Sequence, residues 1–156
     1  MLFSQSKFLP VHGYELESGI LEILSRAKRS IVICSCEFNS RSDFLLSGKL
    51  YEKLNQGCRI RVYGNNYRQL HSLWSSFNSP NLDVNVWNPP AEKSLFHIKA
   101  VVVDDTYIYI GSANLSINAM TNSSEWGLTG NSPDIALSLV KYLKELEDSN
   151  LFLKLI

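Results

Sequence analysis

One short, regularly spaced set of residues has the clearest capacity for chemistry. His97 is followed by Lys99, by Asp104 after four further residues, and by Gly111-Ser112-Ala113-Asn114 after six more. Alternate side chains of a β-strand share a face, so the imidazole and the ammonium would lie on one surface. A neutral imidazole can attack phosphorus, while lysine, serine and asparagine side chains can hold phosphate oxygens. The residue types and their spacing therefore predict a catalytic or phosphate-binding site.

Two apolar, β-branched runs predict that these residues lie on a β-hairpin. The runs are Ala100-Val101-Val102-Val103 and Thr106-Tyr107-Ile108-Tyr109-Ile110, with Asp104-Asp105 as the turn signal between them. A two-residue loop would pair Lys99 with Ile110 and His97 with Ser112, which brings the hydroxyl within about 5 Å of the imidazole. Asp104 would then lie about 23 Å along the strand from His97. We therefore expect Asp104 to act in the turn or in a structural salt bridge.

Together, His97, Lys99 and Asp104, closed by Gly111-Ser112 and Asn114, resemble the HKD motif of the phospholipase D superfamily. Six identities at fixed spacing would coincide by chance at about 10^-8 per starting position. The resemblance is closest to short bacterial endonucleases that carry a single motif per chain. Within the motif, Gly111 is expected where the backbone must turn or approach closely.

The resemblance covers about residues 15–130 and adds Glu125, which matches a glutamate that those endonucleases place beside the histidine. It implies that His97 forms a phosphohistidine and that Glu125 bonds one ring nitrogen and fixes the tautomer. Lys99, Ser112 and Asn114 are expected to donate to the phosphate oxygens. This mechanism calls for no metal ion and no other cofactor.

An acid for the departing oxygen is the part that the chain itself lacks, because it has no second HKD-like stretch. Resemblance to the one-motif endonucleases implies that His97 of the partner subunit supplies it. An isologous twofold contact brings the same patch of both subunits together. We therefore expect an obligate homodimer with one shared active site on its axis.

The rest of the chain is expected to form the scaffold that positions this motif. Apolar periodicity predicts helices over 15–28, 43–57, 69–79 and 115–121 and a final helix that begins at Pro133. Apolar runs predict strands over 30–38, 59–65, 82–87 and 125–129, and a loop or short strand over 1–13. The pattern indicates one α/β domain over 1–156, and the resemblance implies the phospholipase D-like fold, a mixed central β-sheet flanked by helices on both faces.

Polar loops beside the predicted strand ends are candidates for the rim of the substrate site, since ligands gather beyond the carboxyl ends of strands in α/β sheets. Two such loops contain Arg41, Asn65 and Arg68, and Lys93 precedes the hairpin in a proline-containing loop. A solvated surface position is the alternative for each of the four. The tryptophans, Trp74, Trp87 and Trp126, are expected in the core rather than as base-stacking platforms.

The composition of the chain limits the functions and locations that it can have. The 15 basic and 15 acidic residues give a net charge of zero, which argues against nucleic-acid binding by bulk charge and leaves a local basic groove open. Cys34, Cys36 and Cys58 are expected to be buried free thiols, because their number and spacing fit neither a disulfide framework nor a zinc site. The absence of a signal-like apolar segment or a membrane span in the sequence predicts a cytoplasmic protein without stable membrane association.

Three function classes follow, of which a nuclease is our prediction. An endonuclease or phosphodiesterase would act on DNA or RNA, and single strands would fit a narrow dimer groove. A phospholipase D-type lipid hydrolase or phosphatidyltransferase should carry an amphipathic apolar surface, which the sequence does not show. The third class is a non-catalytic nucleic-acid-binding subunit of a larger complex, which a weakly charged chain would suit.

Overall fold

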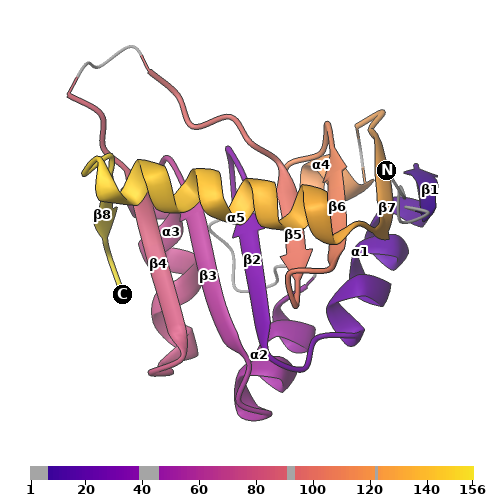
Figure 1. Ribbon diagram of the computed structural model, residues 1–156, viewed down its shortest axis with the longest axis horizontal. Helices are drawn as coiled ribbons and strands as arrows, with labels where there is room; N and C mark the ends of the chain where they lie inside the picture. Colours follow the sequence, from indigo (N-terminus) through magenta and orange to yellow (C-terminus); the bar gives the residue numbers. More distant parts are fainter. Residues whose placement is uncertain (1–6, 39–45, 91–93, 122) are drawn as a thin grey trace.

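The computed structural model describes residues 7–38, 46–90, 94–121 and 123–156, and these form one mixed sheet with helices on both faces (Figure 1). The strand order is β1-β7-β6-β5-β2-β3-β4-β8. The strands are β1 (Lys7–His12), β2 (Ser30–Cys34), β3 (Arg59–Gly64), β4 (Leu82–Trp87), β5 (Ala100–Val103), β6 (Tyr107–Gly111), β7 (Trp126–Asn131) and β8 (Phe152–Lys154). The helices are α1 (Glu15–Ser25), α2 (Ser47–Asn55), α3 (Tyr67–Trp74), α4 (Ile117–Thr121) and α5 (Pro133–Asp148), and a 3-10 turn, η1, spans Ser75–Phe77.

The sheet separates two apolar layers. On one face, α1, α2 and α3 pack over the inward side chains of the central strands, Val101 and Val103 of β5 among them. On the other face, α5 crosses the sheet (Figure 1) and packs Ala136 and Leu143 against residues that include Val102. Strands β2 to β4 run parallel, while β5, β6 and β7 are antiparallel neighbours. The predicted fold class is therefore confirmed.

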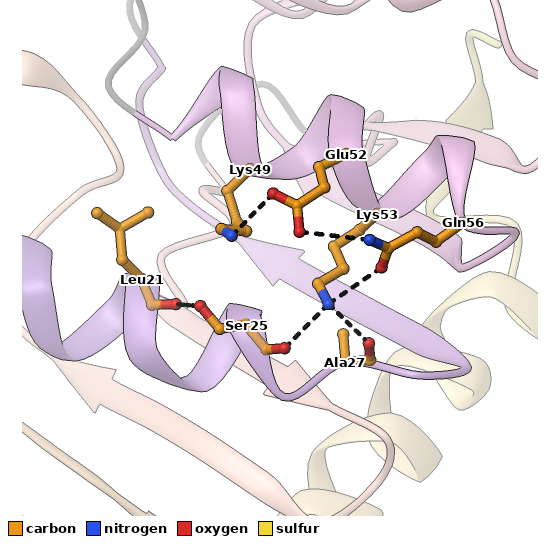
Figure 2. Close-up of polar contacts among 7 residues, drawn as sticks. All are labelled: Leu21, Ser25, Ala27, Lys49, Glu52, Lys53 and Gln56. Carbon is orange, nitrogen blue, oxygen red and sulfur yellow. Dashed lines mark hydrogen bonds and ion pairs between the residues drawn. The ribbon is translucent and has the colours of Figure 1, made fainter.

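Helix α1 is shorter than the predicted 15–28 because a buried lysine caps its carboxyl end (Figure 2). Lys53, only 6% exposed, donates from Nζ to the carbonyl oxygens of Ser25 at 2.9 Å and Ala27 at 3.0 Å. Its third acceptor is Gln56 Oε1 at 3.3 Å. These carbonyls have no partner within the helix, so the Lys53 ammonium, which comes from α2, supplies the hydrogen bonds that the end of α1 lacks.

Further elements differ from the predictions, and β2, for example, ends at Cys34 rather than at residue 38. The predicted helix over 69–79 is α3, which begins earlier and ends at Trp74, followed by η1. Strand β8 was not predicted, because its three residues are too few to show alternation and it forms only by pairing with β4 at the sheet edge. Among the described residues, no helix is both long and apolar enough to cross a membrane.

The turn of the β5–β6 hairpin lies at Asp104-Asp105, as predicted. Both residues take left-handed backbone angles, with φ of 52° and 53°, and Thr106 N–H closes the turn on Val103 O at 3.0 Å. Left-handed angles are tolerated by aspartate better than by most residues.

The predicted hairpin register is wrong by one residue, because Thr106 bulges out of the ladder. Its hydroxyl donates to Asp104 O at 2.9 Å, and its carbonyl accepts from Ser132 N–H at 2.9 Å instead of pairing across the hairpin. Val103 therefore pairs with Tyr107. The shift continues to the end of the hairpin, where Gly111 N–H bonds Lys99 O at 3.4 Å, so Ser112 is not the residue opposite His97.

Candidate active site

The predicted catalytic residues meet at one end of three neighbouring strands. His97 and Lys99 lead into β5, Ser112 follows β6, and Glu125 precedes β7. Because β6 is antiparallel to both β5 and β7, the start of β5, the end of β6 and the start of β7 lie together. The backbone bond from Ser112 N–H to Trp126 O, 3.0 Å, ties the last two segments.

Lys99 lies against the imidazole of His97. Its Nζ is 3.2 Å from His97 Nε2, 3.3 Å from Nδ1 and 3.3 Å from the His97 carbonyl oxygen. Lys99 is half-buried, whereas His97 is exposed. A phosphorus atom that approached the ring from solvent would therefore bring its oxygens within reach of a fixed positive charge.

Glu125 pairs with Ser112 rather than with His97. The Ser112 hydroxyl donates to the Glu125 carboxylate and accepts from Trp126 N–H at 3.1 Å. Within the described part of the chain, the side-chain hydrogen-bond partner of His97 is Lys99, so the expected bond from Glu125 to the ring is not formed. The β6–β7 pairing explains this arrangement, because it sets Ser112 directly beside the start of β7.

Gly111 stands at a close approach between β6 and β7. A Cβ at this position would lie 2.7 Å from Trp126 O, 2.7 Å from the Tyr109 hydroxyl and 2.8 Å from Gly127 Cα. Tyr109 is fully buried, and burial raises its pKa to about 12, so the hydroxyl beneath the site stays protonated. The missing side chain of Gly111 is what lets the Tyr109 ring lie under the motif.

The Asn114 amide is held through its acceptor end. Its Oδ1 accepts from Glu37 N–H at 3.4 Å, in the segment that follows β2. The Nδ2 group is therefore the end that can donate to a phosphate oxygen.

Asp104 lies at the opposite end of β5 and joins the hairpin to the start of β2. Its carboxylate accepts from the backbone N–H groups of Lys28, Arg29 and Ser30, each at 2.9 Å. Partial burial acts to raise the pKa of Asp104, but the donors at Ser30, Arg29 and Lys28 outweigh it and hold the pKa below its ordinary value.

Of the four rim candidates, Asn65 has a role that sequence reasoning did not anticipate. Its Nδ2 donates to Phe96 O at 2.6 Å and its Oδ1 accepts from Phe96 N–H at 2.8 Å. These two hydrogen bonds hold the residue before His97 in place. In the sequence, only the position of Asn65 at the end of β3 hinted at this role. Arg68 lies exposed in the first turn of α3, while Arg41 and Lys93 lie outside the described residues.

The tryptophans differ from one another in burial, and so do the cysteines. Trp74 is fully buried, as predicted, whereas Trp126 is 55% exposed, so the core prediction for it is wrong. Cys34, Cys36 and Cys58 are free thiols, and Cys36 is only partly buried. In the described ranges, no three side chains among His, Cys, Asp and Glu are grouped to hold a metal ion.

Comparison with known proteins places this geometry in a family. The protein-family model described as "Cardiolipin synthase, PLD-like domain" matches residues 20–147. NucT from Helicobacter pylori superposes with a TM-score of 0.77 at 19% identity, covering 97% of this chain and 100% of NucT. The phospholipase D family member Nuc from Salmonella typhimurium gives 0.74 at 17% identity, covering 96% of this chain and 99% of Nuc.

A larger protein shares the fold over part of its length. Phosphatidylserine synthase from Haemophilus influenzae Rd KW20 gives a TM-score of 0.72 at 21% identity, covering 96% of this chain and 39% of the synthase. No curated protein sequence matches the chain. Because the family model spans most of the sequence and the structures share its fold throughout, the chain belongs to the phospholipase D-like family.

Proposed function

We propose that the protein is a metal-independent phosphodiesterase that cleaves nucleic-acid backbones, with His97 as nucleophile. The observation that carries the proposal is the contact of Lys99 Nζ with the exposed imidazole, 3.2 Å from Nε2, at the strand end where Ser112 and Asn114 also lie. The match to NucT and Nuc over nearly their whole lengths supports it, since it agrees with the resemblance to short one-motif endonucleases.

The reaction divides into two displacements at phosphorus. A ring nitrogen of His97 attacks, the phosphorus–oxygen bond to the leaving alcohol breaks, and a phosphohistidine forms. His97 of the partner subunit protonates the departing oxygen, then removes a proton from the water that cleaves the phosphorus–nitrogen bond. Lys99 and the Asn114 amide hold the non-bridging oxygens.

Glu125 and Ser112 act as a linked pair in this scheme. Without substrate, the Ser112 hydroxyl donates to the Glu125 carboxylate. A bound phosphate offers that hydroxyl a new acceptor, and the released carboxylate becomes available to the His97 ring. The tautomer role expected for Glu125 thus belongs to the substrate-bound state.

The homodimer remains part of the proposal. A single chain places one motif histidine at the site, whereas the two displacements need both a nucleophile and an acid.

The decisive experiment is cleavage of labelled single- and double-stranded DNA and RNA in EDTA. We expect wild type to cut and His97→Ala to leave the strands intact. The matched control is His71→Ala, which removes a histidine stacked on Tyr67 in α3, away from the motif. Loss of cutting in EDTA, or equal cutting by His97→Ala, would refute the histidine mechanism. Mixing wild-type with His97→Ala chains under subunit exchange tests the shared site, because a heterodimer carries one His97 where the scheme needs two, so activity should fall more steeply than the wild-type fraction.

A phosphatidyl-transfer reaction is the second candidate. The description of the family model names cardiolipin synthase, and the similar structure from Haemophilus influenzae is named a phosphatidylserine synthase. Both names refer to phospholipids. The same two displacements would serve a phospholipid, with an alcohol in place of water. Turnover of phosphatidylglycerol vesicles by wild type, with no cutting of nucleic acid, would favour this function.

A further inference from the structure

An apolar cavity opens directly beside His97, and the phosphodiester chemistry does not use it. Its volume is about 510 Å³, and His97, Phe96 and Ile98 form one wall. Trp87, Tyr142 and Leu146 stand among the residues of the other walls. It lies where the segment leading into β5 passes the carboxyl-terminal half of α5, the helix that crosses this face of the sheet (Figure 1).

Packed aromatic side chains hold the wall of the cavity that carries His97. Phe96 is 3% exposed and packs edge-on against Phe152, with centroids 5.3 Å apart. Trp87 packs on the same Phe152 ring at 5.2 Å, and its indole N–H donates to Ser94 O at 3.2 Å. The Asn65 bonds to Phe96 fix the wall that also carries His97. The cavity and the nucleophile therefore keep a constant relation to each other.

Tyr142, like Ile98, lines this cavity and also a second one. Its ring is 49% exposed and also lines a hollow of about 450 Å³ that reaches Lys99 and Gly111. One aromatic side chain thus lines two hollows, one that includes His97 among its lining residues and one that includes Lys99. Flat groups on either side of a reacting phosphate would meet this ring.

Resting on the proposed function, we propose that the cavity beside His97 is a nucleobase subsite in which a base next to the scissile phosphate stacks on Tyr142 and Trp87. Bases are flat, apolar on both faces, and held at a short distance from the phosphate by the sugar. Base stacking on aromatic side chains contributes about five- to hundredfold in affinity and tolerates any base. A duplex keeps its bases stacked on each other, so this subsite selects single strands.

The zero net charge of the chain also favours a subsite that binds a base by stacking. With 15 basic and 15 acidic residues, the protein has little bulk charge with which to gain affinity from phosphates. Stacking supplies the missing affinity without charge.

The test compares two fluorescent single strands of equal length, one with natural bases and one with an abasic backbone. Binding is followed by anisotropy in a His97→Asn background, so that the strands stay intact. We expect the natural strand to bind about tenfold more tightly than the abasic strand. Tyr142→Ala should remove that difference, and Tyr142→Phe, which keeps the ring, should preserve it. Leu137→Ala is the control, since Leu137 is 50% exposed on the same helix and lines neither cavity.

Each outcome decides between the two proposals. Equal binding of both strands, or an equal loss for both in Tyr142→Ala, overturns the subsite even where wild type cuts nucleic acid. Base-dependent binding that needs Tyr142, without cutting by wild type, supports the subsite and refutes the nuclease. Tyr142-dependent binding of phosphatidylglycerol vesicles, with no binding of either strand, overturns both and assigns the cavity to a lipid.

Discussion

Asn65 and Phe96 are joined by two hydrogen bonds that use both ends of the asparagine amide, 2.6 Å to the Phe96 carbonyl oxygen and 2.8 Å from its N–H. Asn65 Nδ2 also donates to Cys36 O at 3.2 Å. One side chain thereby holds together the end of β3, the segment after β2 and the residue before His97. The position of the proposed nucleophile depends on this amide.

Asn65→Ala should slow cleavage more than it unfolds the protein. We expect kcat to fall about ten- to hundredfold with a smaller change in KM, because the reacting ring loses its fixed position. Asn65→Asp keeps the acceptor and loses the donor, so an intermediate rate is expected. The adjacent Asn66→Ala is the control, since Asn66 caps α3 by accepting from Gln69 N–H at 3.1 Å. It should cost about 1 kcal/mol in urea unfolding and leave kcat unchanged. Equal kinetic effects of the two alanines would argue against the positioning role.

Gly111→Ala should disrupt the site through the backbone. The new Cβ would lie 2.7 Å from Trp126 O and 2.8 Å from Gly127 Cα, so the two strands must move apart. We expect a loss of about 1–3 kcal/mol in the free energy of unfolding, together with loss of activity. Gly48→Ala in α2 is the control, because a Cβ there has nothing within 4 Å, and it should be neutral or slightly stabilising. A fully active and stable Gly111→Ala variant would contradict the close approach.

Asp104→Asn should change how stability depends on pH. The pKa of Asp104 is lower in the folded chain than in the unfolded one, so its charge contributes stability above the unfolded pKa of about 4. That contribution is lost as pH falls through the lower, folded pKa. Asparagine tolerates the left-handed angle at this position, so the substitution removes mainly the charge.

The measurement is urea unfolding at pH 7 and again near pH 3. We expect Asp104→Asn to lose about 1–2 kcal/mol at pH 7 and to approach wild type at the lower pH. Asp105→Asn, in the same turn and the same backbone conformation, serves as the control. A deficit that is the same at both pH values would show that the charge of Asp104 is not what stabilises the start of β2.

Lys53→Met should destabilise the fold and spare the site. The substitution leaves the Ser25 and Ala27 carbonyl oxygens without their ammonium donor in a buried position (Figure 2). We expect a loss of about 2 kcal/mol by thermal or urea unfolding, with kcat of the folded fraction unchanged. Lys49→Met is the control, because its pair with Glu52 lies nearer the surface and contributes less than about 1 kcal/mol. If both variants lost the same free energy of unfolding, the Lys53 cap would contribute no more than the Lys49–Glu52 ion pair.

Several features of the fold were predictable from the sequence because they repeat along the chain. The apolar spacing predicted α1, α3 and α5, and the β-branched runs predicted the β5–β6 hairpin and its turn at Asp104-Asp105. The bounds of α1 were not predictable, since its end is set by Lys53, a residue of another helix. The same holds for β8, which exists only through its pairing with β4.

By itself, the sequence determined which residues gather at the site, because motif spacing and strand alternation are local properties of the chain. His97, Lys99 and Ser112 follow from that spacing, and Glu125 follows from the resemblance to the one-motif endonucleases. Only the tertiary structure decided their relations: Thr106 leaves the ladder for Ser132, and Glu125 meets Ser112. It also formed the cavity beside His97, whose walls come from segments far apart in sequence. Such contacts form only when the whole chain packs, so no local pattern encodes them.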